Sequence, residues 1–360
     1  SEVVAAKRTV PAMEALIQRL VEANPGVPEE AIWRYVQRQL QAESREYATS
    51  FRSPLNQADA PPPEVRLTSR CHCGRSVFCW DVEVKSLKLS RCYCPSCCRF
   101  LASSFAAYLS SDVALPLPNK TGGSIQTARG VCKVLGTVDR FLCSACFSKI
   151  AVAPVHGDQA GKLFICLGSV EDDSIPNGLA MRWQTGYDEW ERVSEPSWWR
   201  ATPGPCVLPH RSLQLRGACS CGKCEFSARL LPGEAQHCYC KLCRRMSGSV
   251  AQTWLPAPKE SFSWTRSEGL RLFRTTSHGQ RHVCTSCGTI MTIVYDSQPD
   301  CIWPAGGTLD MDSLTQGLAN GSEPKPPPIL WYRVIHICCS YMQSWYQLPD
   351  DELPRLKYAG

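Results

Sequence analysis

The chain lacks the features that mark several classes of protein. No apolar run approaches the ~18 residues that a membrane-spanning helix needs, so no membrane span is expected. The 39 Lys and Arg residues are scattered and do not form the basic face of a nucleic-acid-binding protein. The seven histidines show no metal-ligand spacing, and the H-x-E motif of zinc deaminases is absent.

Cysteine, in contrast, is abundant, with 23 of 360 positions. The cysteines occur as tight C-x-C and C-x-x-C pairs, whereas disulfide frameworks are typical of short secreted chains. We therefore favour metal ligation in an intracellular reducing compartment, the cytoplasm or an organelle matrix, over disulfides. The formal charge of +6 counts every cysteine as neutral. Fourteen thiolates around four Zn²⁺ ions would bring the chain close to neutrality, so nucleic acid is not an expected partner.

An internal repeat organises the sequence. A C-x-C-G motif, a C-x-C-x-x-C motif and a C-x-x-C motif follow one another twice, at offsets of 148, 146 and 141 residues. Short segments rich in Val, Ile, Thr, Phe and Trp, such as 250–255, 270–275 and 289–295, predict strands within each copy. The apolar stripes of the first 47 residues recur at helical spacing. The expected organisation is a helical extension (1–50), a linker (51–65), a divergent first domain (66–202), a linker (203–210) and a second domain (211–360).

The seven cysteines of each copy divide into four and three. Zinc takes four ligands in structural sites, and three plus an open position in reactive ones. We expect two closed sites, formed by Cys71, Cys73, Cys143 and Cys146, and by Cys219, Cys221, Cys284 and Cys287. We expect two sites open to an external ligand, formed by Cys92, Cys94 and Cys97, and by Cys238, Cys240 and Cys243. The other nine cysteines, Cys98, Cys132, Cys224 and Cys338 among them, are interpreted mainly as small buried residues. Cys98 and Cys224 lie close to ligand clusters and are alternative ligands, which we do not favour.

The second copy resembles the glutathione-dependent formaldehyde-activating enzyme family, which includes centromere protein V. The resemblance covers roughly residues 210–355. Its motifs are Gly217-Ala218-Cys219-Ser220-Cys221-Gly222, Cys238–Cys243 followed by Arg244-Arg245-Met246-Ser247-Gly248, Cys284–Thr289, Gly307-Thr308-Leu309-Asp310, His336-Ile337 and Trp345. The first copy, roughly residues 66–200, resembles the family more weakly.

The resemblance implies a mostly β fold with two tandem β-tent (Mss4-like) domains. It also implies a structural zinc on each set of four cysteines and a functional zinc on the three-cysteine cluster. The family's activity joins glutathione to formaldehyde to form S-(hydroxymethyl)glutathione, a carbon–sulfur lyase reaction. We expect up to four Zn²⁺ per chain, with a small-molecule thiol such as glutathione as the substrate.

Three thiolates on Zn²⁺ leave a position that a thiol can fill, and the metal would deprotonate that thiol. The expected catalytic residues are Cys238, Cys240, Cys243 and Arg244. Arg244 and Arg245 are candidates to offset the negative charge of the cluster or to hold a glutathione carboxylate. The alternative is that one or both are solvated surface residues, and for Arg245 this alternative is equal. His72 and His237, which lie beside ligand cysteines, are either hydrogen-bond donors to those ligands or simple surface residues, and we favour the surface interpretation.

The first copy departs from this pattern after its third motif. It has Phe147 in place of the glycine, Gly168–Asp172 only loosely resembles Gly307–Asp310, and Met181 is expected at the position of His336. We interpret this copy as mainly structural. The alternative for the whole chain is a non-catalytic tandem zinc scaffold or accessory subunit that binds a protein partner through residues 1–47.

Overall fold

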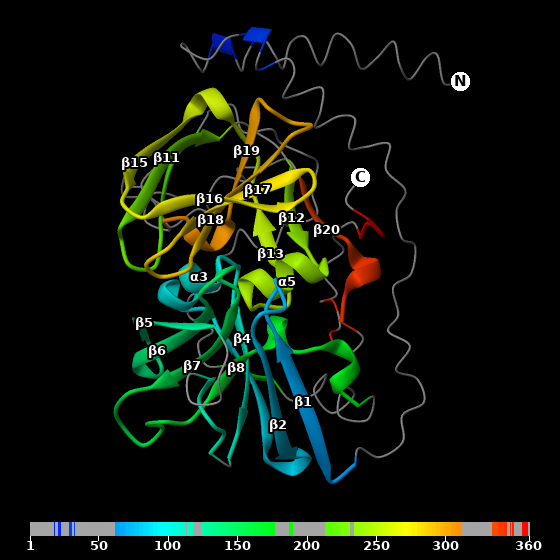
Figure 1. The fold of residues 1–360 in the computed structure, drawn as a ribbon. Helices are drawn as coiled ribbons and strands as arrows, with labels where there is room; N and C mark the ends of the chain where they lie inside the picture. The colour runs from blue at the N-terminus through cyan, green and yellow to red at the C-terminus, as the bar shows by residue number, and fades with distance from the viewer. Residues whose placement is uncertain are drawn as a thin grey trace, which may run out of the picture.

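A computed structural model describes most of the chain beyond residue 61. The described residues are 62–112, 114–118, 124–176, 187–189, 213–230, 234–310 and 333–343, together with 18, 21, 22, 29, 30, 32, 346, 348 and 355–358. The mostly β architecture expected from the sequence is confirmed (Figure 1). No helix in this part of the chain is long and apolar enough to span a membrane.

The first half contains strands around one short helix. Its elements are β1 (Glu64–Arg70), β2 (Val77–Glu83), β3 (Leu87–Cys92), α3 (Pro95–Leu101), β4 (Ala106–Ser111), β5 (Ile125–Cys132), β6 (Gly136–Cys143), β7 (Lys149–Pro154), β8 (Phe164–Cys166) and β9 (Tyr187–Glu189). The hairpin β1–β2 forms a two-stranded sheet of its own, and the other strands form a seven-stranded sheet with the order β5-β6-β7-β8-β4-β3-β9.

The second half has equivalent elements in the same order. They are β10 (Leu213–Ala218), β11 (Cys224–Leu230), β12 (Glu234–Cys238), α5 (Lys241–Ser247), β13 (Gln252–Trp254), β14 (Ala257–Pro258), β15 (Phe262–Ser267), β16 (Leu270–Thr276), β17 (Gly279–Cys284), β18 (Ile290–Tyr295), β19 (Cys301–Pro304) and β20 (Arg333–Ile337). The strands predicted around 250–255, 270–275 and 289–295 are confirmed as β13, β16 and β18. In place of the seven-stranded sheet of the first half, the second half has two smaller sheets with the orders β14-β19-β18-β17-β16 and β13-β12-β20.

Alternation of apolar and polar residues explains why strands form where they do. In β2 the side chains of Phe78, Trp80 and Val82 are buried, whereas the residues between them are exposed. Successive strand side chains point to opposite faces, so this sequence can bury one face of a strand. The strand β7, which lies inside the seven-stranded sheet, is buried along its whole length, and its residues contribute to two hydrophobic clusters.

The two halves share their hydrophobic core. One buried cluster combines Phe100, Leu101 and Tyr108 of the first half with Met246 and Trp254 of the second. The helices α3 and α5 lie where the halves meet (Figure 1), and each packs against a short helical turn of the opposite half. The two copies predicted from the sequence are therefore packed as one body, and the predicted domain boundaries remain a prediction.

Glycine makes this reciprocal packing possible. A Cβ on Gly168 would lie 2.4 Å from the carbonyl oxygen of Arg244, and one on Gly307 would lie 2.4 Å from that of Cys98. Both distances are below any normal contact, so each turn approaches the opposite helix closely only because it lacks a side chain. The weak sequence similarity between these two glycine segments thus corresponds to equivalent places in the two halves.

Two further expectations meet the structure here. Most of the helical extension lies outside the described residues, although its Ile32 is completely buried in the shared core. Met181 lies outside the described residues as well. His336 pairs with His237, the residue before Cys238, and Glu189 pairs with Arg91, the residue before Cys92. Glu189 is therefore the equivalent of His336 in the first half, and the expectation that Met181 takes this place is wrong.

Candidate metal and thiol site

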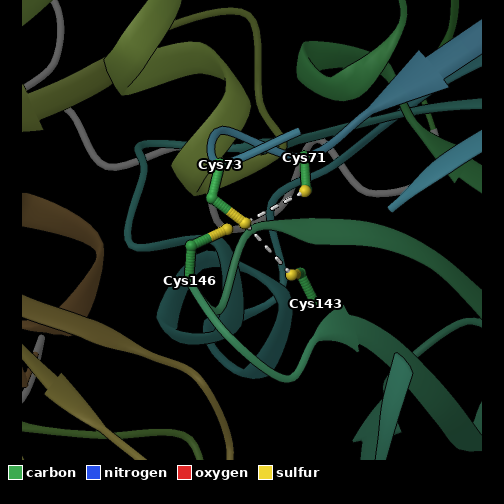
Figure 2. A group of neighbouring side chains, drawn as sticks. All are labelled: Cys71, Cys73, Cys143 and Cys146. Carbon is green, nitrogen blue, oxygen red and sulfur yellow. Dashed lines mark hydrogen bonds between the residues drawn. The ribbon is translucent and has the colours of Figure 1, made fainter. Parts of the chain in front are cut away.

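The structure brings together every cysteine that the sequence predicts as a metal ligand. Four sets of cysteines form, and within each set the sulfur atoms lie within 4.8 Å of one another. They are the β1–β6 cluster (Cys71, Cys73, Cys143, Cys146), the α3 cluster (Cys92, Cys94, Cys97, Cys132), the β10–β17 cluster (Cys219, Cys221, Cys284, Cys287) and the α5 cluster (Cys238, Cys240, Cys243). Figure 2 shows the sulfurs of the β1–β6 cluster converging from two separate turns.

The sulfur spacing fits a metal ion. A tetrahedron with Zn–S bonds of about 2.3 Å has an edge of about 3.8 Å. The Sγ atom of Cys73 lies 3.6 Å from that of Cys71 and 3.7 Å from that of Cys143. The corresponding distances around Cys221 are 3.5 and 3.7 Å. All 22 described cysteines are free, so the disulfide alternative finds no support in this part of the chain.

Backbone and hydroxyl groups orient the sulfurs in the same way in both halves. The backbone N–H of Ser76 donates to Cys71 Sγ at 3.2 Å, and that of Cys224 donates to Cys219 Sγ at 3.2 Å. The Ser148 hydroxyl lies 3.2 Å from Cys146 Sγ, as the Thr289 hydroxyl does from Cys287 Sγ. Such hydrogen bonds stabilise thiolates, the form that binds metal.

Lys149 supplies positive charge near these thiolates. Its ammonium group is completely buried and donates to the carbonyl oxygen of Gly288 at 2.5 Å. Burial lowers the pKa of Lys149 to about 7, whereas the nearby sulfurs, Cys287 foremost, favour the charged form. Because four thiolates on Zn²⁺ carry a net charge of about −2, a metal in either four-cysteine cluster would strengthen the charged state of this lysine.

The α5 cluster is built from the end of one strand and the first turn of one helix. Cys238 ends β12, Cys240 caps α5, and the backbone N–H of Cys243 donates to Cys240 Sγ at 3.4 Å. The pKa of Cys240 lies well below its ordinary value, because Cys238, Cys243 and Cys338 hydrogen-bond to its sulfur. The compact spacing thus concentrates a thiolate and two further sulfurs where one ion can bind all three.

The first half differs from the expectation at the equivalent place. Cys132, interpreted from the sequence as a small buried residue, lies among Cys92, Cys94 and Cys97, with its Sγ 4.0 Å from that of Cys92. An open fourth position therefore does not fit the α3 cluster. No sequence signal pointed to Cys132, because it stands alone and 35 positions after Cys97.

Other cysteines near the clusters are not members of them. The thiol of Cys98 lies within hydrogen-bond distance of the carbonyl oxygens of Tyr93 and Ser104, and Cys224 donates to that of Glu268. Neither belongs to a cluster, in agreement with the expectation that neither is a ligand. Cys338 interacts with Cys238 and Cys240 but does not come within 4.8 Å of all three α5-cluster sulfurs. Among the described residues the α5 cluster alone has three members.

Three buried residues next to the α5 cluster carry polar atoms without a partner among the described residues. Gln252 pairs with Cys238 across β12–β13, so their side chains share a face, and both of its amide atoms are unpaired. The Nε atoms of Arg281 and Trp254 are unpaired as well. The Nη2 atom of Arg281 lies 3.4 Å from Cys243 Sγ, and its guanidinium lies 5.6 Å from the centre of the Trp254 ring.

Buried polar atoms without a hydrogen bond are rare because leaving one unpaired costs about 1–3 kcal/mol. Their concentration beside the three-cysteine cluster favours a polar ligand at this place. The sequence motifs did not identify these three residues.

Arg244 and Arg245 contact the first half rather than an open space. Arg244 is buried, and its guanidinium donates to both carboxylate oxygens of Asp172, at 3.2 and 2.9 Å. It also donates to the carbonyl oxygens of Tyr239 and Tyr341, each at 3.0 Å. Arg245 pairs with Glu171. These contacts favour a role in joining the halves, and substrate binding by either arginine remains a prediction.

The ion pair between Arg244 and Asp172 yields a stability prediction. We expect Asp172→Ala to lower the free energy of unfolding by about 2–3 kcal/mol, because it leaves the guanidinium buried without its carboxylate. Urea unfolding of the metal-loaded chain measures this. Asp173→Ala, at an exposed neighbouring position, is the matched control and should change the stability by no more than about 0.5 kcal/mol. Equal effects of the two substitutions would contradict the structural role of the pair.

The histidines near the cysteines have defined surroundings. His237 is only 7% exposed, and its Nδ1 lies 2.9 Å from the Thr253 hydroxyl, so its interpretation as a surface residue is wrong. His336 is buried, and its Nδ1 lies 3.0 Å from the hydroxyl of Tyr239. The two rings lie 5.4 Å apart and flank the strand end that carries Cys238. Because His237 precedes Cys238 in β12 and pairs with His336, both rings lie on the face of the sheet opposite to that of Cys238.

Comparisons with known proteins point to one family. Residues 214–324 match the family model of glutathione-dependent formaldehyde-activating enzymes. A curated Halomonas elongata protein, provisionally named a glutathione-dependent formaldehyde-activating enzyme, is 23% identical over 155 residues, which are 41% of this chain and 87% of that protein. A crystal structure of a Rhodobacter sphaeroides protein shows 24% identity, covers 30% of this chain and 91% of its own, and has a TM-score of 0.24.

The matched segment holds the α5 cluster and the β10–β17 cluster, the two sets of cysteines that the second half contributes. The second half of the chain is therefore similar, over residues 214–324, to the glutathione-dependent formaldehyde-activating enzyme family.

Proposed function

We propose that the α5 cluster holds Zn²⁺, binds a small-molecule thiol such as glutathione and joins it to formaldehyde, as a carbon–sulfur lyase of the S-(hydroxymethyl)glutathione synthase type. The observation that carries the proposal is the number of sulfurs. Three described sets of cysteines have four members, whereas the α5 cluster has three. The family match and the named relative support a function related to glutathione and formaldehyde.

Zinc bound to Cys238, Cys240 and Cys243 would supply a Lewis acid with one position left for an external thiol. The chain's own residues orient what binds there. The hydrogen bond from the Cys243 backbone fixes Cys240, and the guanidinium of Arg281 offsets negative charge at Cys243. Thiolate ligands last only where cysteines stay reduced, so we also propose a reducing compartment for this protein.

The reaction forms a C–S bond between the thiol and the carbonyl carbon. The thiol loses its proton, the C=O double bond becomes a single bond, and the oxygen gains a proton. Gln252, which pairs with Cys238, and Arg281, which reaches Cys243 Sγ, carry unpaired N–H groups, as does Trp254 beside Arg281. Donors aimed at an oxygen that gains negative charge stabilise the transition state. We therefore propose that these three residues donate hydrogen bonds to the carbonyl oxygen of the aldehyde.

Substitution of Cys240 tests the proposal. We expect Cys240→Ser to abolish glutathione binding, measured by isothermal titration calorimetry on the zinc-loaded chain, because the cluster loses its thiolate. Cys98→Ser is the matched control: its hydroxyl can donate to one of the two carbonyl oxygens near the present sulfur, and glutathione binding should not change. Unchanged affinity in Cys240→Ser, with the fold intact by circular dichroism, would refute the proposal.

A further inference from the structure

We infer that Cys132 completes a closed four-thiolate metal site with Cys92, Cys94 and Cys97, so that the first half cannot bind an external thiol. All four cysteines are buried, and their sulfurs lie within 4.8 Å of one another. Cys132 itself is 1% exposed. Four converging sulfurs satisfy the tetrahedral preference of Zn²⁺ and leave no position for another ligand. This inference stands apart from the proposed function, which concerns the α5 cluster.

The fourth sulfur is carried by a longer hairpin. In both halves the hairpin ends opposite the first cysteine of a C-x-x-C motif, since Ile125 pairs with Cys143 and Leu270 pairs with Cys284. The first-half hairpin spans 19 residues between these positions, and the second-half hairpin spans 15. Cys132 pairs with Gly136 at the tip, within the part that the shorter hairpin lacks. The extra length is therefore what delivers Cys132 to the cluster.

A buried arginine holds this tip against the helix of the cluster. Arg140 donates to the carbonyl oxygen of Val131 at 3.0 Å and to the hydroxyl of Ser96 at 2.9 Å. Its guanidinium also lies 4.5 Å from the centre of the Phe100 ring. Val131 precedes Cys132, and Ser96 precedes Cys97, so one side chain links the segments that carry the distant sulfur and the helical sulfur.

The equivalent arginine of the second half is arranged differently. Arg140 pairs with Ala128, and Arg281 pairs with Phe273. Ala128 and Phe273 are each the fourth residue of their hairpin, so the strand register makes the two arginines equivalent. Arg281 reaches Cys243 Sγ directly and keeps its Nε unpaired. The second half thus has an arginine at the cluster and no hairpin cysteine, whereas the first half has a hairpin cysteine secured by the arginine. Together with the open α5 cluster of the proposed function, the closed α3 cluster gives one open site and three closed sites per chain.

Cadmium substitution tests this inference on the full chain. ¹¹³Cd resonances separate coordination by four sulfurs from coordination by three sulfurs and an oxygen or nitrogen ligand. With four equivalents of ¹¹³Cd bound, we expect three resonances in the four-sulfur range and one in the three-sulfur range. Cys132→Ser should move one resonance from the four-sulfur to the three-sulfur range. Cys79→Ser, an exposed cysteine of the same half outside any cluster, should move none.

The number of four-sulfur resonances and the effect of Cys132→Ser together test the inference. Fewer than three four-sulfur resonances in the unaltered chain, or no change in Cys132→Ser, would overturn the inference. If Cys132→Ser does not fold, Cys338→Ser decides the question: an unchanged spectrum leaves the three-sulfur site at the α5 cluster, whereas loss of a four-sulfur resonance would place it in the first half and overturn the inference. Four resonances in the four-sulfur range, of which Cys132→Ser moves one, would support the closed first-half site and instead contradict the open α5 cluster of the proposed function, pointing to Cys338 as its fourth ligand.

Discussion

Removal of the metal should unfold this protein. Structural zinc sites contribute about 10–16 kcal/mol of apparent binding free energy in zinc-finger peptides at neutral pH. The net stability of a folded domain is about 5–15 kcal/mol. Loss of a single closed site would therefore cost as much as the whole fold provides. The β1–β6 and β10–β17 clusters each tie together segments more than 60 positions apart, so their loss frees the ends of several strands.

Chelation under reducing conditions measures this effect. We expect the cooperative thermal transition, followed by calorimetry and far-ultraviolet circular dichroism, to disappear as elemental analysis shows the zinc content falling. The first ion to leave should come from the three-sulfur α5 cluster, and its loss should lower the stability least. Cys71→Ser should reproduce part of the destabilisation, whereas the exposed Cys79→Ser should not. A metal-free chain with an unchanged transition would contradict a structural role for the clusters.

Replacement of Gln252 should slow catalysis without weakening thiol binding. If its amide N–H stabilises the carbonyl oxygen in the transition state, Gln252→Ala should lower kcat by roughly 10²-fold, as the loss of one such donor does elsewhere. The fold should tolerate the change, because Ala106 occupies the equivalent position opposite Cys92 in the first half. The loss of an unpaired buried amide also removes a cost to the native state.

The experiment compares steady-state kinetics with the glutathione affinity of the same variant. A fall in kcat with unchanged affinity supports a role at the carbonyl oxygen, whereas a parallel loss of affinity would place Gln252 at the thiol instead. Gln280→Ala is the matched control, since Gln280 lines a groove with Trp264 and His282 that contains no cluster cysteine. Activity unaffected by Gln252→Ala would contradict the assignment of this residue.

Much of the candidate site could be predicted because its ligands come in short local motifs. A C-x-C or C-x-x-C pair places two sulfurs near each other in almost any turn, so the 14 predicted cysteines do appear in the four clusters. The β strands were predictable for a similar reason, since alternation such as that of Phe78, Trp80 and Val82 is a property of adjacent residues. The match of the second copy to a family also depends on ordered local motifs.

Contacts between residues that lie far apart in the sequence could not be predicted from local motifs. Cys132 has no cysteine neighbour in sequence and becomes a cluster member only because a longer hairpin folds over α3. Arg244 appeared suited to a substrate carboxylate, but the packing of the halves gives it Asp172, 72 positions away. The pairing of β3 with β9 identified Glu189 as the equivalent of His336, which residue types alone had assigned to Met181.

The sequence by itself determined the cysteine clusters, the repeated order of motifs and the β character of the chain, because each depends on residues close together along the backbone. The tertiary structure decided which cysteine clusters gather four sulfurs and which gathers three among the described residues. It also decided that the two halves share one core and that unpaired polar groups gather beside the α5 cluster. These features depend on the length of one hairpin and on the close contact that two glycines allow, and both act between segments distant in sequence.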